Sequence, residues 1–294
     1  MRNRISNRTL TKRNGAAFAA AGCVLGLAMG VVLTTPRGLY AQGKGGGKGG
    51  GKGGGGAPAV AQTAKAAAPI DLTGYWVSIV TEDWRYRMVT PSKGDFQGVP
   101  MTAAARAIAN AWDPAKEVAS GDQCKSYGAP ALLRVPGRLH ITWQDDNTLR
   151  MDSDAGKQTR LLHFGDWKSP GGPPTLQGDS VADWERSGGG GRGGGRGGAG
   201  AKGPPPTDGS LKVVTTNLNG GLLRKNGVPY SDKTTLTEYF DLMKEPTASG
   251  DPVVVVTIVT ADPMYLSRNF VISSQFKKET SDAKWKPTEC SAKW

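Results

Sequence analysis

Residues 138–164 read RLHITWQDDNTLRMDSDAGKQTRLLHF, and this stretch decides the fold class. Apolar and polar residues alternate in three runs, which are separated by Asp145-Asp146-Asn147 and Asp154-Ala155-Gly156. A period of two is typical of strands with one buried face, and Asp, Asn and Gly are typical of the turns between them. We therefore predict an antiparallel meander of three strands. Its alternating apolar residues are Leu139, Ile141, Trp143, Leu149 and Met151.

The strand pattern continues on both sides of the meander. Before it, Trp84, Tyr86 and Met88 alternate with two arginines, which predicts a strand with one wet face. After it, four runs rich in β-branched and aromatic residues predict further strands. These runs cover residues 210–216, 234–240, 253–260 and 270–277.

Few helices interrupt the strands. One is predicted over Thr102 to Trp112, because threonine is a good N-cap and Asp113-Pro114 ends the pattern. Asp113-Pro114 can itself begin a short second helix, since proline suits the first helical position. Many short strands with few helices predict a mainly β fold. We expect a single antiparallel β-barrel of eight or more strands with one or two short helices, and a β-sandwich is the alternative.

The first predicted strand opens with Gly74-Tyr75-Trp76. These three residues resemble the Gly-x-Trp opening of the lipocalins and related calycin barrels, and the resemblance implies a barrel architecture. A barrel of about eight strands is just wide enough to be filled by side chains or to hold one small ligand.

A longer stretch, from Ser180 to about Phe276, is similar to a group of secreted, functionally uncharacterised β-rich bacterial proteins. In similar proteins a strand follows the pair Trp184-Glu185 within a few residues, whereas residues 187–209 intervene here. The resemblance implies a disordered Gly/Arg-rich insertion in a hairpin loop, and it brings no established activity. The other matching pieces are Leu211-Lys212-Val213-Val214-Thr215, Leu236-Thr237-Glu238-Tyr239-Phe240, Thr257 and Asp262-Pro263-Met264-Tyr265.

The N-terminal residues predict export. Residues 1–41 have a basic start, an apolar run and a small-residue exit ending at Ala41, as in a cleaved signal peptide. This pattern predicts a periplasmic or extracellular protein. The apolar run is nearly long enough to span a bilayer, and Ala20-Ala21-Gly22-Cys23 loosely matches a lipoprotein box, so a membrane-anchored form stays open. Residues 42–69 are predicted to be a disordered Gly/Lys/Ala-rich linker, and 70–294 the barrel domain.

A net charge of +12 is typical of proteins that bind nucleic acid, but here the positive charge is concentrated in three segments of the chain. Thirteen of the 37 basic residues lie in the leader, the linker and the tract 187–203, where no acidic residue occurs; the rest of the chain has 24 basic and 25 acidic residues. The tract also lacks the aromatic residues that stack on bases. We predict no nucleic-acid partner, and only weak contact of the basic linkers with anionic envelope surfaces.

Two cysteines remain after removal of the leader. Cys124 and Cys290 form an even pair in an oxidising compartment, which predicts a disulfide between them. Two separate buried thiols are the alternative. Neither cysteine belongs to a CxxC pair, which disfavours metal binding by cysteine.

Strand residues supply the candidate ligand site. Apolar pockets with a few polar groups are the usual form of a small-molecule site, so we expect aromatic and acidic side chains to line the barrel lumen. The candidates are Trp76, Trp84, Tyr86, Trp143, Glu185, Glu238 and Tyr239.

Signals for catalysis are weak. His140 and His163 are the two histidines and are expected on neighbouring strands, and no phosphate loop, nucleophile elbow or HExxH motif occurs. We predict no catalytic residue, metal or cofactor, and an exported barrel that binds a small apolar or amphipathic molecule. A cell-envelope or matrix structural module, and a carboxylate-based hydrolase or isomerase using Glu185 or Glu238, remain alternatives.

Overall fold

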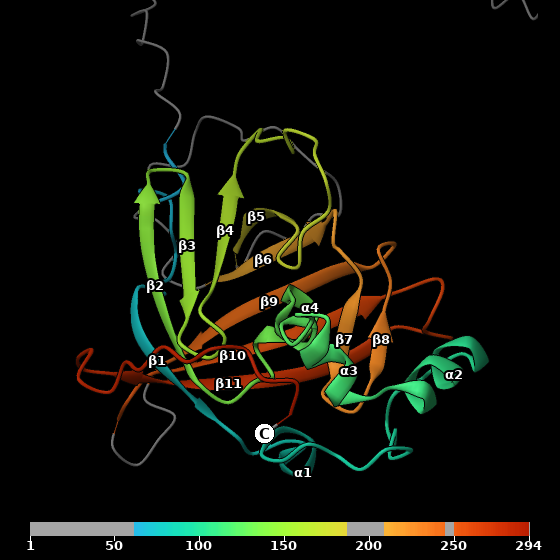
Figure 1. The fold of residues 1–294 in the computed structure, drawn as a ribbon. Helices are drawn as coiled ribbons and strands as arrows, with labels where there is room; N and C mark the ends of the chain where they lie inside the picture. The colour runs from blue at the N-terminus through green and yellow to red at the C-terminus, as the bar shows by residue number, and fades with distance from the viewer. Residues whose placement is uncertain (1–61, 187–208, 245–249, 294) are drawn as a thin grey trace, which may run out of the picture. The chain divides into compact units, whose positions relative to one another are not determined.

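The structure is a computed structural model that describes residues 62–186, 209–244 and 250–293 (Figure 1). The predicted signal peptide, residues 42–61 of the predicted linker and residues 187–208 of the predicted Gly/Arg-rich insertion lie outside these residues. Nine strands close into a barrel. In neighbour order they are β1 (Gly74–Ile79), β11 (Phe270–Glu279), β10 (Val253–Ala261), β9 (Thr235–Met243), β6 (Gly209–Thr216), β5 (Asp179–Arg186), β4 (Gln158–Phe164), β3 (Thr148–Ser153) and β2 (Arg138–Asp145).

The predicted mainly β barrel of eight or more strands is confirmed. The sheet is mixed, because β4 and β5 run parallel, with Leu162 opposite Ser180, while the other neighbouring barrel strands are antiparallel. Residues 165–178, GDWKSPGGPPTLQG, join this pair. Parallel neighbours need a long connection in place of a tight hairpin, and this segment provides it.

The meander that the sequence predicts is formed by β2, β3 and β4. In its first turn the backbone N–H of Asn147 donates to Asp145 Oδ1 at 2.8 Å. In the second turn the Arg138 amide donates to Asp154 Oδ1 at 2.7 Å. Gly156 follows at φ +77°, and a Cβ there would lie 2.4 Å from the Tyr127 ring, so only glycine fits.

Helices and a small hairpin lie outside the barrel sheet. The helices are α1 (Trp84–Arg87), α2 (Ala103–Ala111), α3 (Pro114–Ala119), the 3₁₀ helix η1 (Lys125–Tyr127) and α4 (Ala129–Leu132). The hairpin pairs β7 (Gly221–Arg224) with β8 (Val228–Tyr230). Helix α2 packs on β8, while η1 and α4 pack on β7 (Figure 1).

Both predicted helix starts are confirmed by their caps. Thr102 Oγ1 accepts from the Ala105 amide at 3.3 Å at the start of α2. Asp113 Oδ1 accepts from the Ala115 amide at 2.9 Å, with Pro114 as the first residue of α3.

The strand predicted from Trp84, Tyr86 and Met88 is wrong, because these residues form the helical turn α1. Asp83 adopts φ 51°, and the Met88 amide then donates to Trp84 O at 2.8 Å. Trp84 is 64% exposed and Met88 53% exposed, so the alternation marks no buried face. Arg87 is the buried residue of this turn.

Three further predictions concern the edges of the domain. The Cys124–Cys290 disulfide is present and joins the residue before η1 to the C-terminal segment. Arg186 pairs with Gly209 across the antiparallel strands β5 and β6, and the insertion predicted between them lies outside the described residues. The predicted linker 42–69 ends in residues that pack on the barrel, since Ala64 is buried and its carbonyl accepts from Trp184 Nε1 at 2.9 Å.

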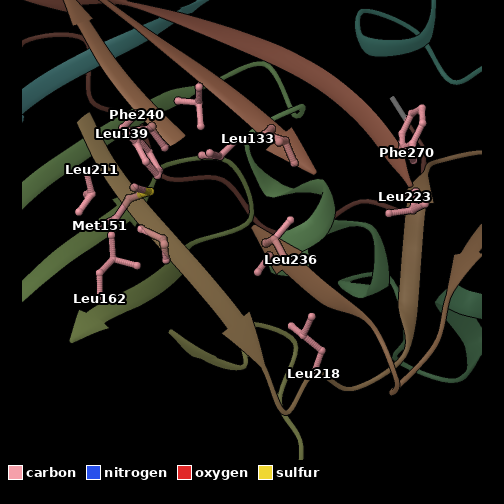
Figure 2. Close-up of a cluster of buried hydrophobic side chains, with 14 of the residues drawn as sticks. Leu133, Leu139, Met151, Leu162, Leu211, Leu218, Leu223, Leu236, Phe240 and Phe270 are labelled. Carbon is pink, nitrogen blue, oxygen red and sulfur yellow. The ribbon is translucent and has the colours of Figure 1, made fainter. Parts of the chain in front are cut away.

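The main core fills the barrel and continues under the β7–β8 hairpin. Figure 2 shows barrel side chains such as Met151, Leu211 and Phe240 in one cluster with Leu133, which caps α4, and Leu223 of β7. At 25 cal/mol per Å², each fully buried Leu or Phe contributes about 1.5–3 kcal/mol. The helices and the hairpin are therefore fixed to the barrel by shared apolar packing.

Candidate functional site

The inside of the barrel is occupied by side chains, including an ion pair. Arg160 Nη1 donates to Glu238 Oε1 at 2.9 Å, and Arg160 Nη2 donates to Glu238 Oε2 at 2.5 Å; both side chains have 0% exposure. Arg160 Nη2 also donates to Thr215 Oγ1, which shares a hydrogen bond with Ser180 Oγ. The bidentate geometry satisfies the carboxylate, so Glu238 acts as a structural partner of Arg160.

Of the predicted lumen residues, Trp76 and Glu238 lie inside the barrel. Trp76 is 1% exposed, and its Nε1 donates to Leu72 O at 2.8 Å. Trp143 lies half-buried at one end of the barrel, where its ring is 5.6 Å from Phe164 and 6.5 Å from Trp184. These aromatic residues pack together and against the core.

The remaining candidates lie outside the barrel core. Tyr86 is on α1 beneath Arg224, whose guanidinium lies 4.1 Å from the ring. Glu185 is exposed at the end of β5, 3.6 Å from Lys212 Nζ, and the same Lys212 lies 5.8 Å from the Tyr239 ring. Glu185 and Glu238 face opposite sides of the sheet, so their carboxylates do not converge.

The two histidines lie on β2 and β4, with β3 between them. His140 stacks on Tyr75 at 4.1 Å, and His163 stacks on Trp167 at 4.1 Å. Burial lowers the pKa of His163. Within the part of the chain that the structure describes, no group of three or more His, Cys, Asp or Glu side chains could hold a metal ion.

A cleft of ligand size lies between the helices and the β7–β8 hairpin. It has a volume of about 470 Å³, within the range of roughly 300–1,000 Å³ that small-molecule sites have. We call it the α2 cleft. Its apolar walls are Ile108, Ala111, Trp112, Leu222 and Pro229, and its polar side chains are Glu117, Lys125, Tyr230 and Tyr265.

Glycines let the hairpin approach the helices closely enough to form this cleft. A Cβ on Gly227, which has φ +89°, would lie 2.2 Å from Trp112 Cβ. A Cβ on Gly221 would lie 2.5 Å from Tyr230 Oη and 2.6 Å from Lys125 O. Since real atoms cannot approach so closely, the floor of the cleft depends on these two residues being glycine.

The α2 cleft has one half-buried acidic group, Glu117. Burial raises the pKa of its carboxyl, and the Trp112 indole and the Lys125 ammonium act in the opposite direction. Lys125 itself pairs with Asp122 at 2.8 Å. The cleft therefore joins an apolar wall to a carboxyl that can accept a hydrogen bond.

The sequence did not point to this cleft. Its residues come from 108–125 and 220–230, with Tyr265 added from a third segment. The signal available was the run Asn219-Gly220-Gly221 and the later Gly227, which mark close backbone approach but do not say to what.

The fold defines this chain as a closed, mixed β-barrel protein with a helix-flanked cleft outside the barrel. Comparison of the chain with known protein families, with curated proteins and with solved structures finds no match. The two resemblances based on sequence motifs therefore stay predictions. Among the described helices, none has the length and apolar character needed to cross a membrane.

Proposed function

We propose that this protein is an exported, non-catalytic barrel that binds a small amphipathic molecule in the α2 cleft. The observation that carries the proposal is the cleft itself: about 470 Å³ of space, with apolar walls and one half-buried carboxyl. The barrel interior, where the sequence placed the ligand, holds Trp76, the Arg160–Glu238 pair and the apolar core instead. The ligand therefore binds between the helices and the hairpin, outside the sheet.

The chemistry of the cleft selects the kind of ligand. Trp112, Leu222 and Pro229 offer contacts to an apolar body, and burial of about 100 Å² of such surface contributes about 2.5 kcal/mol. Glu117 accepts hydrogen bonds, so a ligand with an amine or hydroxyl group fits better than one with a carboxylate. A carboxylate would meet a like charge.

The test uses three probes with one carbon skeleton: 2-phenylethylamine, 2-phenylethanol and phenylacetate. Two-dimensional NMR of the full chain follows the Trp112 indole N–H at pH 7, assigned with Trp112→Phe. We expect the amine and the alcohol to shift this resonance with dissociation constants of about 1 mM, as befits ligands of this size, and phenylacetate to bind at least tenfold more weakly.

Two Ala→Phe substitutions on α2, one inside the cleft and one outside it, provide a test variant and its matched control. Ala111→Phe fills the α2 cleft and should abolish the shift, whereas Ala107→Phe places the same ring on an exposed position that does not line the cleft. Unchanged binding by Ala111→Phe, or no shift with any probe at 10 mM, would show the proposal to be wrong.

A further inference from the structure

A second, smaller cavity is lined by cationic side chains from three separate parts of the chain. It has a volume of about 20 Å³ and lies between α1, the end of α4 and β7. Arg87 comes from α1, Arg134 follows α4, and Arg224 ends β7. Ser126 of η1 lies on the same wall. We call this the arginine cavity.

All three arginines are buried. Arg87 is 2% exposed, Arg134 5% and Arg224 4%. Burial, together with the nearby Arg134, lowers the pKa of Arg87 and of Arg224 to about 10. With pKa values of about 10, Arg87 and Arg224 remain charged at neutral pH, so the fold holds like charges around a space the size of one small atom, which Lys225 also lines.

The surrounding acidic groups balance this charge only in part. Asp83 accepts from Arg134 Nη1 at 3.3 Å and Nη2 at 3.2 Å, and it lies 3.9 Å from Arg224 Nη2. Its left-handed backbone, φ 51°, is a conformation that aspartate tolerates better than most residues. Asp95, the next carboxylate, pairs with the exposed Arg85. Glu82, which accepts from Ser273 Oγ, attracts Arg87 and Arg134 from farther away, as Asp95 attracts Arg224. Among the described residues, Asp83 is thus the carboxylate that lies within 4 Å of these buried arginines, and incompletely paired buried charge is costly.

Several donors of the arginine cavity lack partners. Arg87 Nε donates to Arg134 O at 2.9 Å, and Arg224 Nη1 donates to Gln97 O at 2.7 Å. Arg87 Nη2, Arg224 Nε and Ser126 Oγ, all buried, have no hydrogen-bond partner among the described residues. Arginine can only donate, so an occupant that only accepts satisfies these groups. A water molecule would bring two protons that themselves need acceptors.

We propose that the arginine cavity binds one monatomic anion, with chloride as the physiological candidate. The space of about 20 Å³ admits a single water-sized particle, which excludes sulfate, phosphate and carboxylates as whole molecules. The anion accepts from the unpartnered donors, offsets the repulsion among the arginines and ties α1 to β7. This site is independent of the α2 cleft and of its ligand.

The experiment measures thermal unfolding of the full chain in sodium gluconate at constant ionic strength, with up to 50 mM replaced by chloride, bromide or sulfate. Because an anion that binds only the folded state stabilises it, chloride and bromide should raise Tm by about 2–4 °C. The broadening of the ³⁵Cl NMR line, reversed by bromide, gives a second readout that needs no variant.

Arg87→Met and Ser126→Ala should each reduce the chloride effect at least threefold, and Arg106→Met, an exposed arginine of α2, should leave it unchanged. Far-UV circular dichroism checks that the variants fold. Equal stabilisation by sulfate in native protein and Arg87→Met would overturn the proposal, as would a ³⁵Cl line of unchanged width.

Discussion

Replacing Glu238 by glutamine leaves the Arg160 guanidinium charged inside the barrel with a neutral partner. Both side chains have 0% exposure, and two hydrogen bonds of 2.9 and 2.5 Å join them. Breaking a buried pair by removing one charge costs about 3–5 kcal/mol, because the other charge stays buried. With a urea slope of about 3 kcal/mol per M, the upper end of the usual range, the unfolding midpoint of Glu238→Gln should fall by about 1–2 M.

The double variant Arg160→Met/Glu238→Leu separates the charge from the packing. Removing both ions leaves Thr215 Oγ1 with its hydrogen bond to Ser180 Oγ, so no buried hydroxyl is orphaned. Apolar replacement of a buried pair is often neutral or stabilising. We therefore expect the double variant to recover most of the midpoint that the single variant loses, and a coupling energy of at least 2 kcal/mol in the double-mutant cycle.

A matched acidic residue on the outer face supplies the control. Glu185 is exposed and lies 3.6 Å from Lys212 Nζ, so Glu185→Gln should change the free energy of unfolding by less than about 0.5 kcal/mol. A loss below 1 kcal/mol for Glu238→Gln would refute the reasoning. It would mean that water reaches Arg160 and that the barrel interior has room for a ligand after all.

Three further predictions concern Lys225, Gly128 and the disulfide. Burial lowers the pKa of Lys225 to about 7, so between about pH 7 and 10.5 this amine is protonated in the unfolded chain and neutral in the folded one. The free energy of unfolding should therefore rise with pH in this window by up to about 1.4 kcal/mol per pH unit. Lys225→Met should flatten this dependence when urea midpoints are measured across the same pH range. Gly128→Ala should cost more than about 2 kcal/mol by calorimetry, since its Cβ would lie 1.9 Å from Tyr230 Oη. Reduction of Cys124–Cys290 should lower the free energy of unfolding by about 2–5 kcal/mol in urea titrations with and without reductant, and two free thiols in untreated protein would contradict the bridge.

The parts of the fold that the sequence predicted are those that depend on local chemistry. The turn after Asp145 and the cap at Thr102 are made by side chains within three residues of the backbone groups they satisfy. The period of two in β2 and β3 predicts which of their residues are buried, because one face of each strand packs against the barrel core. The cysteine pair was predictable for a different reason, since only two cysteines follow the leader.

The failures occur where a local pattern competes with a contact far along the chain. Alternation at Trp84 and Tyr86 resembles a strand, yet the buried side chain is Arg87, which is held by Arg134 O. Arg134 lies 47 residues from Arg87, so the sequence around Arg87 does not predict this contact. Glu238, a ligand-binding candidate from the sequence, lies inside the barrel, where it forms an ion pair with Arg160, which is 78 residues away in the chain.

The same reasoning explains why neither cavity could be predicted. Each one is bounded by the β7–β8 hairpin, whose residues 221–230 are all buried and give no alternation to read. Burial on every side means that helices cover this hairpin, but the sequence does not say which. The α2 cleft lies where α2 and α3 meet the hairpin, and the arginine cavity where α1 and the end of α4 meet it. Because Arg224 is one of these buried residues, its charge must be met by groups from other segments, of which Gln97 O and Asp83 supply part; that requirement favours an anion as the further partner in the arginine cavity.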